Sequence, residues 1–129
     1  MEYKKRIMIV DDNLIDQMIT ARILKTNYTQ SEIIMMKSAG EALAYLDEHL
    51  NNPELLPDLI LLDLDMPTMN GFGFLDRFNN YSNSIKETCR IIVLTASEVL
   101  EDIELMQSHP HVFKLIPKPL DKKILIPVM

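Results

Sequence analysis

Cysteine is almost missing from this sequence, in which Cys89 is the single one among 129 residues. One cysteine excludes an internal disulfide and fits a protein of the reducing cytoplasm. Long apolar runs are missing as well, because the run at residues 7–10 stops at Asp11 after four apolar residues. Such a run is too short for the core of a signal peptide or for a membrane span. We therefore expect a cytoplasmic protein that does not enter a membrane.

Positive charge is scarce. The chain has 13 Lys and Arg against 19 Asp and Glu, a formal net charge of −6. Direct binding to nucleic acid is not expected, because phosphate backbones are bound through basic surfaces. No repeat or low-complexity segment is visible. The length and the 47% hydrophobic content are ordinary for a globular protein and predict a single domain over residues 1–129.

Short apolar runs are abundant and regularly spaced. Five of them occur along the chain, at residues 7–10, 33–36, 59–62, 91–94 and 112–116. The first, third and fourth are continuous rather than alternating, which is typical of strands covered on both faces in a parallel sheet. These runs predict five strands.

Helices are predicted between the strands, because apolar residues recur there at helical spacing. The four stripes are Ile15, Met18, Ile19 and Ile23; Ala39, Ala42, Leu43 and Leu46; Gly71, Phe74, Leu75 and Phe78; and Val99, Ile103 and Met106. Ser38 and Glu41 have the spacing of a capping box. A short last helix is expected over residues 120–126, stopped by Pro127. Strands alternating with helices predict a doubly wound α/β fold: a five-stranded parallel sheet with helices on both faces.

Polar residues follow the apolar runs at the points where the strands should end. They are Asp11 and Asp12 after the first run, Asp63 after the third, Thr95 after the fourth and Lys118 after the fifth. Ligands of open parallel sheets bind at the carboxyl ends of the strands. The sequence therefore predicts three carboxylates, a hydroxyl and an ammonium at one rim.

This combination constrains the chemistry of the rim. Three neighbouring carboxylates repel one another and stay ionised together when a cation lies among them. Oxygen ligands suit Mg²⁺, which keeps several waters and accepts one or two carboxylates plus a phosphate. Asp63 can act as a nucleophile toward phosphorus, while Lys118 and Thr95 can contact phosphoryl oxygens. Taken singly, the residues also have structural explanations: Asp11 and Asp12 as helix caps, Thr95 as a strand end and Lys118 as a surface charge.

The sequence resembles the receiver domain of the two-component response regulators over essentially its whole length. The matching segments are "IMIVDDN", "PDLILLDLDMPTMNGFGFL", "IIVLTAS" and "IPKPL", in the family's order. The resemblance implies a flavodoxin-like sheet of order 2-1-3-4-5. By position it makes Asp63 the phosphoacceptor, Asp12 a direct Mg²⁺ ligand and Asp11 a ligand through water. It also implies that Asp65 offers its backbone carbonyl to the metal, that Thr95 is the switch hydroxyl and that Lys118 contacts the phosphoryl group.

The resemblance implies bacterial two-component signalling. The phosphoryl group would come from a sensor histidine kinase or a histidine phosphotransfer protein, with an unidentified downstream protein as partner. The chain would assist its own phosphorylation and dephosphorylation without turning over an independent substrate, as a monomer or a phosphorylation-dependent dimer. Phosphate at Asp63 would shift the population toward a state in which Thr95 moves inward.

Two features depart from the family. Leu115 stands where the family usually carries Tyr or Phe, three residues before Lys118, which affects the readout rather than the phosphorylation chemistry. The segment after Lys118 leaves little room for a full last helix. Two alternatives follow: a degenerate receiver that serves as a docking module, favoured by Leu115, and a haloacid-dehalogenase-like phosphatase, favoured by the "DLD" that begins at Asp63.

Overall fold

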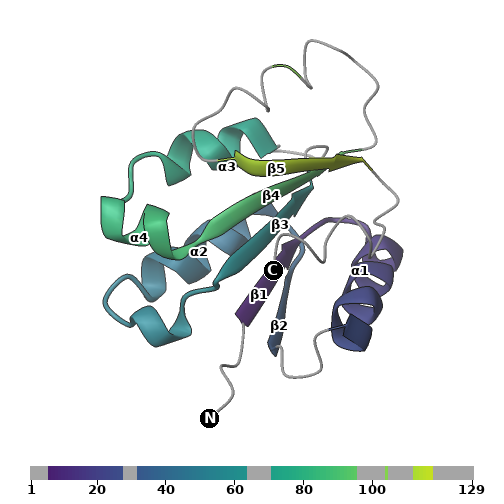
Figure 1. Cartoon of the computed structure of the whole chain (residues 1–129). Helices are drawn as coiled ribbons and strands as arrows, with labels where there is room; N and C mark the ends of the chain where they lie inside the picture. The colour runs from purple at the N-terminus through teal and green to yellow at the C-terminus, as the bar shows by residue number, and fades with distance from the viewer. Residues whose placement is uncertain (1–5, 28–31, 64–70, 96–103, 105–111, 118–129) are drawn as a thin grey trace.

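A single parallel sheet forms the centre of the molecule (Figure 1). The computed structural model describes residues 6–27, 32–63, 71–95, 104 and 112–117. The strands are β1 (Arg6–Val10), β2 (Glu32–Met36), β3 (Leu59–Asp63), β4 (Arg90–Thr95) and β5 (Val112–Pro117). Their order in space is β2-β1-β3-β4-β5, and every neighbouring pair is parallel. The predicted five-stranded sheet and its order are confirmed.

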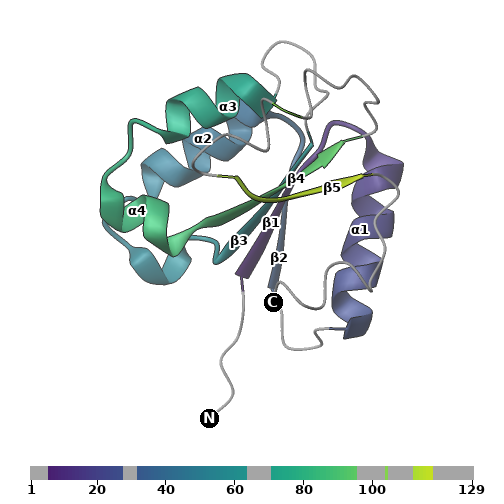
Figure 2. The same ribbon diagram turned by 45° about the horizontal axis from the view of Figure 1, so that its top comes forward.

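Helices cover both faces of this sheet (Figures 1 and 2). The helical segments are α1 (Leu14–Asn27), α2 (Ala39–Glu48), the 3-10 turn η1 (Pro53–Leu55), α3 (Gly71–Phe78) and α4 (Asn83–Thr88). The helix α1 lies on one face, and α2, α3 and α4 lie on the other. The three helices expected from the first three apolar stripes are confirmed. Those expected around residues 99–106 and 120–126 lie outside the described residues.

Helix α4 was not predicted, because its six residues bury one apolar side chain, Ile85. Its start nevertheless has a sequence signal, since the hydroxyl of Ser82 accepts a hydrogen bond from the Ile85 N–H at 3.4 Å. At α2 the predicted N-cap is confirmed: the Ser38 hydroxyl accepts the Glu41 N–H at 3.1 Å. Each cap satisfies an amide that the first helical turn leaves without a partner.

The sheet separates two apolar clusters, one on each face. The larger lies under α2, α3 and α4 and includes Met8, Val10, Ile60, Leu62, Phe74 and Phe78. The smaller lies on the α1 side and consists of Ile7, Ile9, Leu24, Leu59, Leu61, Ile92, Leu94 and Ile116. Alternate residues of β1 and β3 enter opposite clusters, which explains why these strands are apolar throughout rather than alternating.

The apolar stripe of helix α1 does not face the sheet. The opposite side of the helix is the buried one. Ile15, Met18 and Ile19 are exposed, whereas Gln17 and Thr20 are buried. The stripe predicted the helix correctly but did not mark its buried face. Buried apolar contact comes further along the helix, from Leu24, with Ala21 and Ile23 partly buried beside it.

Strand β5 carries an irregularity next to β4. Val112 pairs with Ile91 and residue 114 pairs with Ile92, so Phe113 is the extra residue of a β-bulge. Its side chain is exposed, and the Arg90 guanidinium carbon lies 4.8 Å from the ring centroid. Beyond the bulge, Leu115 is partly buried and packs against the larger cluster.

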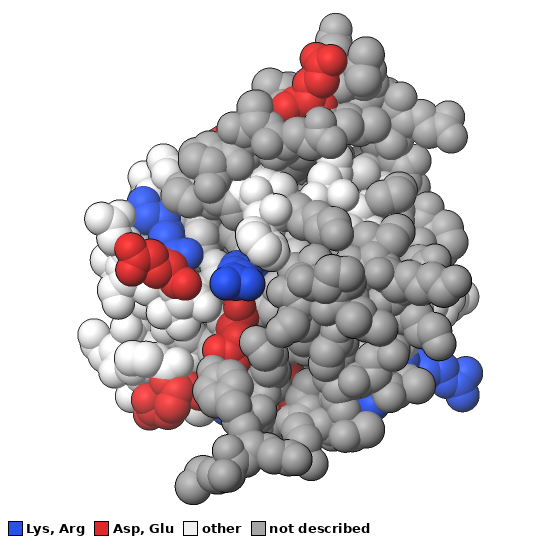
Figure 3. Space-filling view, in the orientation of Figure 1, with Lys and Arg blue, Asp and Glu red and all other residues white. Residues whose placement is uncertain are grey.

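Charged side chains of both signs are interspersed over the described part of the face in Figure 3. Among the described residues, no helix combines the length and the apolar character needed to cross a bilayer.

Candidate metal centre

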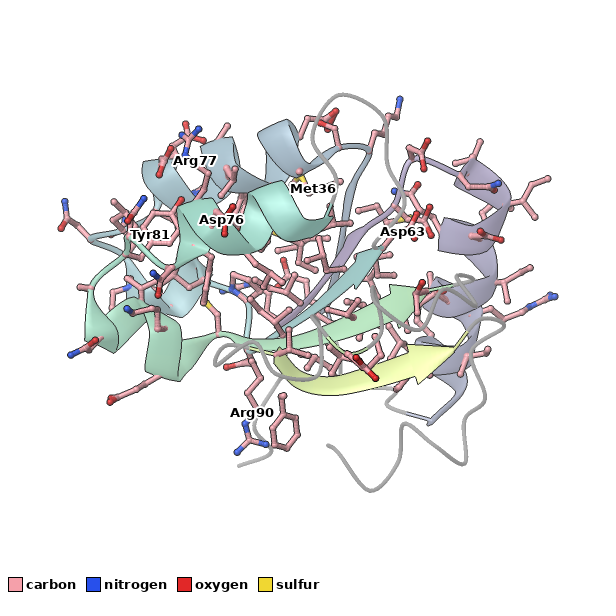
Figure 4. All side chains as sticks on the ribbon, turned by 90° about the horizontal axis from the view of Figure 1, so that it is seen from above. Met36, Asp63, Asp76, Arg77, Tyr81 and Arg90 are labelled. Carbon is pink, nitrogen blue, oxygen red and sulfur yellow. The ribbon has the colours of Figure 1, made fainter. Side chains whose placement is uncertain are left out.

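Three carboxylates meet at the carboxyl edge of the sheet. Asp11 directly follows β1, and Asp63 is the last residue of β3. Because β1 pairs with β3, with Val10 opposite Leu62, these two aspartates leave the sheet side by side. One carboxylate oxygen each from Asp11, Asp12 and Asp63 lies within 4.8 Å of the others. Figure 4 shows Asp63 at this end of β3, on the side where β1 leads into α1.

The three aspartates differ in burial. Asp11 is 2% exposed and Asp63 is 4% exposed, whereas Asp12 is exposed. The Asp11 carboxylate shapes the turn that follows it, because its Oδ1 accepts the Asn13 N–H at 2.9 Å. Asp12 therefore presents the accessible carboxylate of the pair, while the Asp11 carboxylate is hydrogen-bonded to the backbone of the turn.

Two further residues organise this turn. Asn13 caps α1, since its Oδ1 accepts the Asp16 N–H at 3.0 Å. The side-chain amide of Gln17 donates to the backbone carbonyl of Asp11 at 2.7 Å and to that of Met36 at 2.8 Å. Neither residue was predicted from the sequence. Asn13 had a signal, as an N-cap residue just before a helical stripe, but Gln17 had none, because its partners are backbone carbonyls.

The cap also bears on the structural explanation of the acidic pair. With Asn13 as the N-cap of α1, the helix start does not depend on a side chain of Asp11 or Asp12. What the two carboxylates do instead is approach Asp63, which lies more than fifty positions further along the chain. Their placement beside Asp63 thus favours the interpretation as a site over the interpretation as a cap.

Thr95 ends the next strand along the sheet. It is 3% exposed, it follows Leu94, which pairs with Asp63, and it lies opposite Pro117 of β5. The structure thus brings four of the predicted residues to three neighbouring strand ends. Asp65 and Lys118, the other two, lie outside the described residues.

The cluster has the properties of a site for a hard cation. Two buried carboxylates and an accessible one within 4.8 Å repel each other strongly unless positive charge lies between them. All three ligand atoms are oxygens, which suits Mg²⁺ or Mn²⁺ rather than metals that prefer nitrogen or sulfur. The residues present therefore fit a divalent cation.

Comparisons with known proteins agree with this arrangement. The family model described as "Response regulator receiver domain" matches residues 7–128. Response regulator Rcp1 of Synechocystis sp. is 31% identical over 102 residues, which cover 77% of this chain and 67% of Rcp1. Hybrid signal transduction histidine kinase H of Dictyostelium discoideum is 34% identical over 70 residues, 54% of this chain but 5% of the kinase.

Solved structures show the same fold. The two-component response regulator of Cytophaga hutchinsonii superimposes with a TM-score of 0.87 at 22% identity, covering 99% of this chain and 95% of that one. The Mn²⁺-bound form of Rcp1 superimposes with a TM-score of 0.75 at 29% identity, covering 96% and 88%. With a family match over nearly its whole length and an acidic cluster at the carboxyl edge of the sheet, this chain belongs to the receiver-domain family of the two-component response regulators.

Proposed function

We propose that the chain accepts a phosphoryl group on Asp63 in a reaction that depends on Mg²⁺. The observation that carries this proposal is the meeting of buried Asp63 with Asp11 and Asp12 within 4.8 Å. An aspartate carboxylate is a competent nucleophile toward phosphorus when the charge on the phosphoryl oxygens is neutralised. Family membership does not favour the haloacid-dehalogenase-like phosphatase or the degenerate docking module.

The proposed transfer forms one bond and breaks another. An Asp63 carboxylate oxygen attacks the phosphorus of a phosphohistidine, the new O–P bond forms, and the N–P bond to the imidazole breaks. The imidazole nitrogen keeps the electron pair and takes up a proton from solvent. Hydrolysis of the aspartyl phosphate later returns inorganic phosphate and the Asp63 carboxylate, so the chain carries a signal without turning over a separate substrate.

The proposed metal ligands are those that the resemblance to receiver domains implies. Asp12, the accessible carboxylate, and Asp63 would bind Mg²⁺ directly, and Asp11 would act through water. When bound, the cation supplies positive charge against the phosphoryl oxygens as the transfer proceeds. The Mn²⁺-bound form of Rcp1 supports a divalent cation in this fold. Asp65, outside the described residues, is proposed to add its backbone carbonyl.

Two further residues are proposed to contact the phosphoryl group. Thr95 donates its hydroxyl from the end of β4, one position beyond the partner of Asp63. Lys118 follows Pro117, the residue opposite Thr95, and is proposed to supply an ammonium to a phosphoryl oxygen. We propose that residues 1–129 act as one receiver unit in the cytoplasm, with its output through protein contacts.

The donor is proposed to be a sensor histidine kinase or a histidine phosphotransfer protein that docks on α1. The phosphohistidine of the donor must reach Asp63, so the docked donor must cover the surface of this chain next to the acidic cluster. Immediately beside the cluster, Leu14, Ile15 and Met18 on α1 are each at least 60% exposed. A contiguous exposed apolar face next to a reactive group is typical of a protein-interaction site. Ile15→Lys should therefore slow transfer from a phosphorylated phosphotransfer protein while leaving transfer from acetyl phosphate unchanged.

The test of the central proposal is the intact mass of the protein after incubation with acetyl phosphate and Mg²⁺. We expect one phosphoryl adduct that is absent without Mg²⁺ and absent in Asp63→Asn. Asp76→Asn is the matched control, since it removes an exposed carboxylate of α3 far from the cluster (Figure 4) and should leave the adduct unchanged. An adduct that persists in Asp63→Asn would assign the acceptor to another residue.

A further inference from the structure

The buried side chain of Gln17 joins three parts of the fold directly beneath the acidic cluster. Gln17 lies on α1 and is 2% exposed, and its amide contacts the turn after β1 and the end of β2. We propose that Gln17 is a positioning residue that sets the affinity of the acidic cluster for its divalent cation. This inference rests on the proposed function, because it concerns the same metal site.

The geometry uses the donor capacity of the amide fully. The Nε2 atom of Gln17 carries two hydrogens, and it donates to the Asp11 carbonyl at 2.7 Å and to the Met36 carbonyl at 2.8 Å. The Met36 carbonyl also accepts the Asp11 N–H at 3.1 Å. Val10 and Met36 are the last paired residues of β1 and β2. The Gln17 amide thus continues the hydrogen bonding of the sheet past the point where the strands end.

Holding the Asp11 carbonyl orients the next residue. The peptide unit between Asp11 and Asp12 is planar, so fixing its carbonyl oxygen also fixes the direction in which the chain enters Asp12. Asp12 is the exposed member of the cluster, and it follows the peptide unit that Gln17 anchors. Gln17 therefore acts on the accessible carboxylate through the backbone, without contacting the metal.

An apolar residue cannot replace this function. A methionine at position 17 would keep the length and the helix propensity of glutamine but would remove both donors. The Asp11 carbonyl would then lose its bond to the amide in a buried position, and the turn would be expected to shift toward another donor. An asparagine would be one methylene too short to span the same two carbonyls.

The test is the metal affinity of the Gln17→Met variant. Binding of Mn²⁺ is measured by electron paramagnetic resonance, and binding of Mg²⁺ by calorimetry. We expect the dissociation constant to rise about tenfold, the lower end of the range for residues that orient metal ligands. Thr20→Val is the matched control, because Thr20 is another buried polar residue one turn along the same helix face. The control should bind metal like the wild type. Wild-type affinity in a folded Gln17→Met protein would overturn the inference.

A second measurement needs no variant and decides the matter if Gln17→Met does not fold. In the wild-type protein the Gln17 side-chain amide protons should shift during a Mg²⁺ titration and saturate with the same midpoint as the Asp12 amide. An unchanged Gln17 signal would overturn the inference. Failure of the proposed function looks different: the wild-type protein itself would then bind neither Mg²⁺ nor Mn²⁺ at this cluster.

Discussion

At the scale of single residues, the same three carboxylates that would bind a cation destabilise the folded protein when no cation is bound. Asp12 is exposed, yet one of its oxygens lies within 4.8 Å of both Asp11 and Asp63. Two like charges at about 4–5 Å repel by about 1 kcal/mol in a water-like dielectric and by more near a protein surface. We expect Asp12→Asn to raise the free energy of unfolding of the metal-free protein by about 1 kcal/mol.

The measurement is urea unfolding in EDTA and again with Mg²⁺. The variant should gain stability in EDTA and lose most of the additional stabilisation that Mg²⁺ gives to the wild type, because ligand binding to the folded state adds to stability. Asp76→Asn, with the same charge change on α3, should show neither effect. A loss of stability in Asp12→Asn under EDTA would contradict the repulsion argument.

Cys89 is a residue whose protonation depends on the fold. Burial raises the pKa of its thiol from 9.0 to about 12, with a smaller contribution from the negative charge of Asp58. Below pH 9 the thiol is protonated in both states, and its contribution to stability is present in full. Between pH 9 and about 12 the unfolded chain loses the proton first, so the free energy of unfolding falls by about 1.4 kcal/mol per pH unit from this group.

We therefore expect Cys89→Ala to lose stability less steeply than the wild type over that pH range, as measured by denaturant unfolding. Tyr81→Phe provides a parallel case, because burial and the hydrogen bond to Asp47 raise the pKa of Tyr81 as well. The two variants should each remove part of the alkaline loss. Identical slopes for wild type and Cys89→Ala would mean that the thiol titrates alike in both states.

Residue-level prediction from sequence placed polar side chains at the correct edge of the sheet where they end an apolar run, while their chemical roles stay predictions. Asp11, Asp63 and Thr95 were found in this way, because the carboxyl ends of neighbouring parallel strands share an edge. It failed at Gln17, whose buried amide bonds to the carbonyls of Asp11 and Met36. Every residue type carries the same carbonyl, so such a partner leaves no trace in the sequence.

At the scale of elements, α1 shows what helical spacing does and does not reveal. Periodicity locates an amphipathic helix, but the side that faces the sheet is decided by all the groups that the helix must satisfy. Here the amide of Gln17 is needed at the strand ends, and its burial turns Ile15 and Met18 toward solvent. The apolar stripe identified the element correctly, but the side that the structure buries is the opposite one.

The orientation of α1 predicts how substitutions on its two sides change the free energy of unfolding. Met18→Lys should change the free energy of unfolding by less than about 0.5 kcal/mol, because the side chain is exposed and lysine is a good helix former. Leu24→Ala should cost about 2–5 kcal/mol, since it empties a fully buried position of the smaller cluster. Urea denaturation of both variants provides the measurement. A large loss in Met18→Lys would show that the stripe is buried.

At the scale of the whole molecule, the two faces of the sheet are covered unequally in the described part of the chain. The larger cluster receives buried side chains from α2, α3 and α4, while Leu24 is the fully buried apolar residue that α1 gives to the smaller one. Elements with little buried apolar contact tend to open before the rest of a protein. We expect α1 amides to exchange hydrogen through local opening, while β3 amides exchange through global unfolding.

Native-state hydrogen exchange at low urea concentrations measures this difference. Addition of Mg²⁺ should reduce the difference, because a cation bound at the proposed site would restrain the turn between β1 and α1 at Asp11 and Asp12. Equal opening free energies for α1 and β3 would contradict the expected hierarchy.

The central position of β1 also has a consequence for the order in which the protein can be made. β1 lies between β2 and β3, and its first residue, Arg6, donates its N–H to the carboxylate of Asp58, 52 positions later. At a synthesis rate of roughly 5–20 residues per second, the ribosome takes roughly 3–10 seconds to produce that partner. During this interval the apolar residues of β1 have at most one of their two neighbouring strands. The newly made chain is therefore expected to need shielding by a chaperone at β1, the segment that β2 and β3 flank in the finished sheet.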